Sequence, residues 1–166
     1  MSISPSKISD QSIESWKENF SVTLDAAFIG TKTILPSMMK NKQGSIVNVS
    51  SVVGLRGTNF LAAYGAAKSG LINFTKTTSI EAAPHVRVNC IAPGAVMTPA
   101  TMAALPTKEL MESTVNSIPL KRIAAPEEIA SVINFLLSSH ASYLTGICIT
   151  ADGGKTADLN AGLTME

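Results

Sequence analysis

The hydrophobic positions of this chain follow two patterns, one with helical spacing and one of short, continuous apolar runs. Helical spacing predicts helices over residues 12–40, 63–82, 107–117 and 126–138. Three runs are short and largely apolar, and the first is apolar on both faces, as a strand covered on both sides of a sheet is. These runs predict strands over residues 45–51, 86–94 and 146–151.

Capping residues and prolines mark where these helices begin and bend. Ser12 is a favoured N-cap residue, and Glu14 falls in the first turn, where its charge complements the helix dipole. Pro36 is expected to kink the first helix. Pro126 stands at a first turn, a position that accepts proline. Residues 95–106, rich in Met, Ala and Pro, are expected to form a loop.

The order of these elements predicts an α/β fold. Strands that alternate with helices imply a doubly wound parallel sheet with helices on both faces, joined by right-handed crossovers. We assign residues 1–11 to a lead-in, residues 12–155 to a single domain and residues 156–166 to a C-terminal tail.

Composition narrows the possible functions. Hydrophobic residues make up 45% of the chain and charged residues 15%, with a mean hydropathy of +0.25, so we expect part of the surface to be covered by another subunit. A net charge of +1 without a basic run gives no sign of nucleic-acid binding. No run is long enough to span a bilayer, and the polar start lacks a secretory h-region. Cys90 and Cys148 lack metal-ligand spacing, which favours small buried thiols in the reducing cytoplasm.

One stretch, "NVSSVVGLRGTNFLAAYGAAK", suggests chemistry. Tyr64 and Lys68 are four apart, so on a helix they lie on one face. A lysine ammonium about 4 Å from a phenol favours the phenolate by about 4 kcal/mol at an effective dielectric of ~20. A tyrosine with its pKa lowered in this way is an efficient general acid or base. Ser51, at the end of a parallel strand, is where open α/β sheets bind ligands.

Each of these residues also has an ordinary structural interpretation. A lone Tyr-x-x-x-Lys is usually a surface pair, and a serine after a strand usually caps a turn. The combination of strand end, serine, glycine-containing loop, tyrosine and helical lysine is far more restrictive. We therefore predict that Ser51, Tyr64 and Lys68 form a catalytic site.

With these residues the chain resembles a short-chain dehydrogenase/reductase from Ser12 to Gly154. Other matching pieces are "GSIVNVSS", "VRVNCIAPGAVMT", "PEEIA" and "LTG…DGG". The resemblance implies the C-terminal part of a Rossmann-type sheet and interconversion of a secondary alcohol and a ketone with NAD or NADP. It assigns the substrate oxygen to Ser51, the proton to Tyr64, and both pKa tuning and the nicotinamide ribose to Lys68.

The resemblance also implies cofactor contacts in the segment after the second strand. Pro93, Gly94, Val96 and Thr98 would meet the nicotinamide end, with the Val96 backbone and the Thr98 hydroxyl facing its carboxamide. The alternative is that Pro93 and Gly94 only form a turn at the strand exit. The apolar residues that follow suggest an apolar substrate pocket, although Met111 fits helix packing equally well. These residues are Met97, Met102, Leu105 and Met111.

Two features depart from the family pattern. Thr23 stands where the family usually has an asparagine that bends the first long helix and holds a proton-relay water, so we expect reduced turnover. The glycine-rich turn that binds the cofactor pyrophosphate would lie upstream of these residues, and residues 1–20 contain no glycine. We therefore expect weak dinucleotide binding by this polypeptide and an open sheet edge at residues 45–51.

A second hypothesis needs no catalysis. In the family, the helices matching residues 12–40 and 63–82 pack against a second subunit. The chain could therefore be a truncated homologue that forms homo-oligomers or associates with full-length subunits.

Overall fold

A computed structural model describes residues 5–158 of the chain. Its sheet has three parallel strands, as the sequence predicts, and their order is β1-β2-β3. The strands are β1 Gly44–Val49, β2 Val86–Pro93 and β3 Cys148–Ala151. The helices are α1 Ile13–Phe20, α2 Ala26–Lys40, α3 Ala62–Ala82, α4 Pro99–Ala104, α5 Lys108–Asn116 and α6 Pro126–Leu137.

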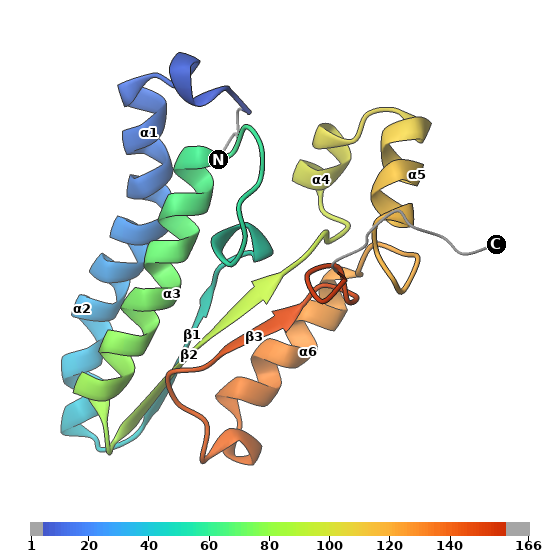
Figure 1. The fold of residues 1–166 in the computed structure, drawn as a ribbon. Helices are drawn as coiled ribbons and strands as arrows, with labels where there is room; N and C mark the ends of the chain where they lie inside the picture. Colours follow the sequence, from blue (N-terminus) through green and yellow to red (C-terminus); the bar gives the residue numbers. More distant parts are fainter. Residues whose placement is uncertain (1–4, 159–166) are drawn as a thin grey trace.

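Helices cover both faces of the sheet (Figure 1). α3 and α2 pack on one face, and α6 packs against β1 and β2 on the other. The central strand β2 is buried along nearly its whole length, which explains its largely apolar sequence. At its start, Val86 and Val88 form a core with Ile46 of β1 and Ala82 of α3.

The first long helix is divided in a way that the sequence did not predict. Instead of one helix over residues 12–40, a π-helical segment, Ser21–Asp25, joins α1 to α2. Thr23 lies buried in this segment. π-helical turns widen the helix locally and often occur at functional sites. Pro36 lies inside α2 and does not end it.

The segment predicted as a loop over residues 95–106 contains a short helix, so that prediction was wrong in part. α4 forms because Thr98 caps it, accepting a hydrogen bond from the Thr101 backbone N–H at 3.2 Å, and because Pro99 stands at its first position. Alanine and methionine, which gave the segment its loop-like composition, are both good helix formers.

Part of the domain assignment lies outside the described residues, namely residues 1–4 of the lead-in and 159–166 of the tail. Within the lead-in, the Ser6 N–H donates to the Phe60 carbonyl at 3.0 Å. Within the part of the chain described, no helix is both long and apolar enough to cross a membrane.

One edge of the sheet is open. Within residues 5–158, β1 pairs with β2 and with no other strand, as expected for residues 45–51. Several large apolar side chains on the adjoining helices are exposed as well. They are Ile13, Trp16, Val22, Phe28, Ile29 and Ile34. Trp16 stacks on Phe20 with its ring partly exposed, at a centroid distance of 5.0 Å.

Candidate active site

Ser51 occupies the turn that follows β1. Its backbone is extended, and its hydroxyl accepts a hydrogen bond from the Val53 N–H at 3.2 Å, which caps the short 3₁₀ helix Val52–Gly54. The capping role considered for this serine is therefore confirmed. It does not exclude a chemical role, because a hydroxyl that accepts one hydrogen bond can still donate its proton.

The turn after β1 is held tightly against α3. The Ser50 hydroxyl donates to the Lys68 carbonyl at 2.8 Å. A Cβ added at Gly54 would lie 2.8 Å from the carbonyl carbon of Lys68 and 2.9 Å from the N of Ser69, so only glycine fits there. Gly65 makes a similar close approach to the Val53 carbonyl. These contacts fix Ser51 relative to the start of α3.

Tyr64 lies in the first turn of α3, where its hydroxyl is close enough to the Ser51 side chain for Ser51 to influence its pKa. The side chain of Lys68, one turn further along, lies on the same side, with its Nζ 5.6 Å from the centre of the Tyr64 ring. The Lys68 ammonium also donates to the Val49 carbonyl at the end of β1, at 2.9 Å. The structure thus brings together the three residues that the sequence singled out.

The electrostatics of Tyr64 differ from the sequence expectation. Burial raises the pKa of Tyr64 above its model-compound value of 10.0, and the neighbouring Ser51 hydroxyl, which favours the phenolate, offsets this only in part. Burial likewise lowers the pKa of Lys68. The Lys68 ammonium lies over the ring face and donates to Val49, so it does not produce the expected lowering of the Tyr64 pKa in this state.

This raised pKa can be measured directly because the chain has only two tyrosines. Tyr143 is fully exposed, so Tyr143→Phe leaves Tyr64 as the single phenol. Absorbance titration of this variant is expected to give a midpoint above 10.0. Tyr64 ionises at a lower pH in the unfolded chain than in the folded chain. The stability contributed by neutral Tyr64 is therefore complete below about pH 10, and it falls as the pH rises towards the pKa of the folded state. A midpoint at or below 10 would contradict the burial of Tyr64.

The segment predicted to meet the cofactor lies at the same edge of the sheet. The Ser50 N–H donates to the Ile91 carbonyl at 2.7 Å and so continues the β1–β2 ladder. Ser51 therefore lies beside the end of β2, where Pro93 and Gly94 follow. This is the carboxyl edge of the parallel strands, where open α/β sheets bind their ligands.

Gly94 is required by packing rather than by its backbone angles. Its N–H donates to the Ala151 carbonyl at 2.9 Å, and an added Cβ would lie 2.8 Å from the Cβ of Asp152. The end of β2 thus packs closely on the turn after β3. The strand-exit interpretation of Pro93 and Gly94 accounts for these contacts.

Val96 and Thr98 differ in what they leave available to a ligand. Ala95 and Met97 make the two backbone hydrogen bonds to Ala124, at 3.1 and 2.8 Å. In a parallel bridge of this kind the N–H of Val96 points away from Ala124. The Thr98 hydroxyl, by contrast, is engaged with α4 through the Thr101 N–H and the Thr101 hydroxyl.

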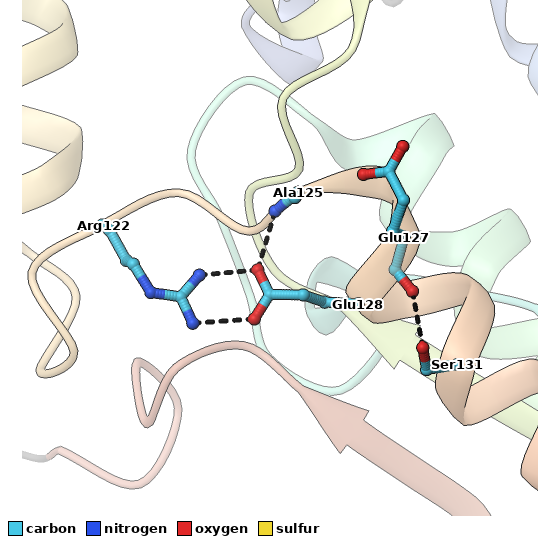
Figure 2. A network of polar contacts seen from close by, with 5 residues as sticks. All are labelled: Arg122, Ala125, Glu127, Glu128 and Ser131. Atoms are coloured by element: carbon cyan, nitrogen blue, oxygen red, sulfur yellow. Dashed lines mark hydrogen bonds and ion pairs between the residues drawn. The ribbon is translucent and has the colours of Figure 1, made fainter.

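An ion pair near this segment was not predicted from the sequence. Arg122 donates to both carboxylate oxygens of Glu128, at 2.6 and 2.7 Å, and the Ala125 N–H donates to the same carboxylate at 2.9 Å (Figure 2). These bonds, first that from Arg122, lower the pKa of Glu128 to about 2. The pair fixes the turn that holds Ala124 against Val96. The Pro-Glu-Glu start of the helix was recognised, but its arginine partner, six residues earlier, was not.

Two of the residues that suggested an apolar pocket have exposed side chains. Met97 and Met102 are 40% and 58% exposed. Met97 immediately precedes Thr98, the cap of α4, and Met102 lies within α4. A separate cavity of about 370 Å³ lies between α6 and the turn after β3, beside the Arg122–Glu128 pair.

Comparison with known proteins places this geometry in context. Residues 2–156 match the family described as enoyl-(acyl carrier protein) reductase. The chain is 46% identical over 142 residues to the 3-oxoacyl-[acyl-carrier-protein] reductase FabG of Thermotoga maritima, covering 85% of this chain and 57% of that protein. It is 36% identical over 152 residues to the cyclopentanol dehydrogenase of a Comamonas species, covering 91% of this chain and 61% of that protein.

A solved structure shows the same fold. A candidate 2-deoxy-d-gluconate 3-dehydrogenase from Agrobacterium tumefaciens with bound NADP superposes with a TM-score of 0.88 at 31% identity. The match covers 94% of this chain and 64% of that one. The chain therefore spans about three fifths of the length of the relatives it matches.

Proposed function

This chain belongs to the short-chain dehydrogenase/reductase family, and from that premise we propose that it carries the catalytic half of an NAD(P)-dependent oxidoreductase. The reaction is the interconversion of a secondary alcohol and a ketone. The relatives described above act, by their names, on a 3-oxoacyl group and on cyclopentanol. Both names imply a carbonyl or alcohol on a largely apolar carbon skeleton.

Each of the three central residues has its own role at the substrate oxygen. Ser51 donates a hydrogen bond to the carbonyl oxygen, and Tyr64 delivers a proton to the same atom. The observation that supports this proposal is the proximity of the Ser51 and Tyr64 side chains, because two neighbouring hydroxyls can meet one oxygen. In alcohol oxidation the same groups act in reverse, and Tyr64 accepts the proton.

The Lys68 ammonium can donate hydrogen bonds to a second partner. One ammonium proton binds the Val49 carbonyl, and two remain. These fit the hydroxyls of a nicotinamide ribose, the contact that the family assigns to this lysine. Ribose held in this way would draw the ammonium towards the Tyr64 oxygen, and the closer charge would lower the pKa that burial raises in the free chain.

The segment after β2 fits the nicotinamide end of the cofactor. Val96 offers a backbone N–H that its bridge to Ala124 leaves pointing outward, suited to a carboxamide oxygen. Pro93 and Gly94 bring this segment to the carboxyl edge beside Ser51. Thr98 would have to share its hydroxyl between α4 and the cofactor. NAD or NADP, when bound, supplies or accepts the hydride.

The proposal is tested best in a chimaera that restores a whole nucleotide-binding fold. The N-terminal residues of the Thermotoga maritima reductase that precede the matching region would be joined to this chain. We expect ketone-dependent oxidation of NADH or NADPH with a 3-oxoacyl thioester or cyclopentanone. A chimaera that folds and binds the cofactor, but reduces neither ketone, would contradict the proposal.

The 166-residue chain itself is expected to bind dinucleotide weakly. Only the nicotinamide half of the cofactor has matching residues here, while a glycine-rich turn and helix N-terminus normally hold the pyrophosphate. At about 1 mM NADH or NADPH, we expect the melting temperature to rise by less than about 1 °C, as for a Kd above about 1 mM. A rise of several degrees would show that these residues bind the dinucleotide unaided.

Association with other subunits is the second candidate function. It is favoured by the exposed apolar side chains on α1 and α2, over residues 12–40, and by the open edge of β1. The helix over residues 63–82 would join the same surface, giving a homo-oligomer or a hetero-oligomer with full-length relatives. Co-purification with such a relative, without activity of the 166-residue chain, would favour this function. Activity of the chain by itself would count against it.

A further inference from the structure

The two cysteines of the chain lie directly opposite each other on neighbouring strands. Cys90 of β2 and Cys148 of β3 are register partners in the parallel ladder, and each thiol influences the pKa of the other. Paired residues on adjacent strands point to the same face of a sheet. Both thiols are free. The sequence suggested two isolated buried thiols, but the fold makes them a pair.

The two thiols differ in accessibility and in acidity. Cys90 is completely buried, whereas Cys148 is partly exposed. The neighbouring Cys90 thiol lowers the pKa of Cys148, and the nearby Lys76 ammonium lowers it further. The Cys148 thiol, together with burial, raises the pKa of Cys90. Cys148 therefore has the features of an attacking thiolate, and Cys90 those of a protonated partner beside it.

We propose that Cys90 and Cys148 form a redox-active pair, which hydroperoxides convert into an intramolecular disulfide between β2 and β3. Strands in a sheet lie about 4.8 Å apart, and disulfides join Cα atoms that are about 4.4–6.8 Å apart, so the pair can be bridged without moving the backbone far. Metal binding is the usual alternative for neighbouring thiols. Over residues 5–158, however, no group of three metal-binding side chains is found.

The chemistry proceeds in two balanced steps. In the first, the Cys148 thiolate attacks the peroxide oxygen, the O–O bond breaks, and with one proton taken up the products are a sulfenic acid and an alcohol or water. In the second, the Cys90 sulfur attacks the Cys148 sulfur, and the S–O bond breaks. The Cys90 proton leaves with the hydroxyl group as water. Two thiols are oxidised, and one peroxide is reduced.

The disulfide would tie together the strands that carry the proposed cofactor segment. Three residues beyond the pair, Pro93 of β2 lies opposite Ala151 of β3. Cys90 also lies close enough to Lys68 to influence the pKa of its ammonium. Oxidation would therefore fix the end of β2 relative to β3 beside the candidate active site. The proposal itself does not depend on the enzymatic function.

The test is intact mass spectrometry of the folded 166-residue chain after treatment with a small excess of hydrogen peroxide. We expect a loss of about 2 Da, corresponding to two hydrogen atoms, that dithiothreitol reverses. The same treatment in urea is expected to give this product far more slowly, because unfolding separates the two thiols. Two free thiols after treatment, disulfides only between chains, or direct gain of two oxygens on Cys148 would each overturn the proposal.

Two variants assign the order of attack. In Cys90→Ser, Cys148 is expected to stop at the sulfenic acid, which dimedone traps. In Cys148→Ser, buried Cys90 is expected to remain a thiol. Circular dichroism shows whether each variant is folded. If neither folds, the mass of the wild-type chain after peroxide treatment still shows whether the disulfide forms. Trapping on Cys90 alone would contradict the assigned order.

Discussion

Replacing Tyr64 with phenylalanine is expected to lower ketone reduction by the chimaera about 10²-fold to 10⁴-fold, the usual contribution of a general acid. The substitution removes one hydroxyl and keeps the ring against which Lys68 lies. Fold and cofactor binding should therefore survive. The measurement compares kcat for the two proteins and checks that NADPH raises their melting temperatures equally.

Tyr143→Phe is the matched control because Tyr143 is fully exposed. It should leave kcat within about twofold, as surface substitutions usually have little effect. If Tyr64→Phe retained full turnover, Tyr64 would not be the proton donor. If it abolished cofactor binding as well, the loss of turnover would not be chemical.

Replacing Gly54 with alanine is expected to destabilise the chain by about 2–3 kcal/mol, the cost of overpacking a closed contact. The new methyl group would meet the backbone of Lys68 and Ser69 at 2.8–2.9 Å, and no side chain there can move aside. The turn after β1 would have to shift away from α3, taking Ser51 with it. Urea unfolding of the 166-residue chain gives the change in stability, and the chimaera gives the loss of turnover.

Gly57→Ala is the control for this contact. Gly57 lies in the same loop, and an added Cβ there meets nothing within 4 Å. Its effect on stability should stay within about 0.5 kcal/mol. Equal effects of the two substitutions would mean that the docking of the turn on α3 does not depend on Gly54.

The sequence predicts the fold well because buried parallel strands carry an unmistakable pattern. The sequence of β2 is largely apolar because α3 and α6 cover both of its faces. Helix boundaries were also predictable where capping residues stand, as at Ser12 and Pro126. α4 was missed because a helix of six residues is too short for helical spacing to show.

The sequence predicts which residues form the site, but it does not predict the direction of the Tyr64 pKa shift. Tyr64 and Lys68 meet because of helical spacing, and Ser51 joins them because a parallel strand ends there. The direction of the Tyr64 pKa depends on burial and on where the Lys68 ammonium binds, and neither can be read from spacing. The pairing of Cys90 with Cys148 depends on strand register, which is a property of the assembled sheet.

The central claim is that Ser51 and Tyr64 act as one unit on one substrate oxygen, and a double-mutant comparison in the chimaera tests it most directly. The kcat values of Ser51→Ala, Tyr64→Phe and the double variant would be measured under the same conditions. Residues that act as a unit are strongly non-additive, so the double variant should lose no more activity than Tyr64→Phe alone. If the fold-loss in kcat of the double variant equalled the product of the two single losses, the two hydroxyls would act independently. They would then not share one oxygen.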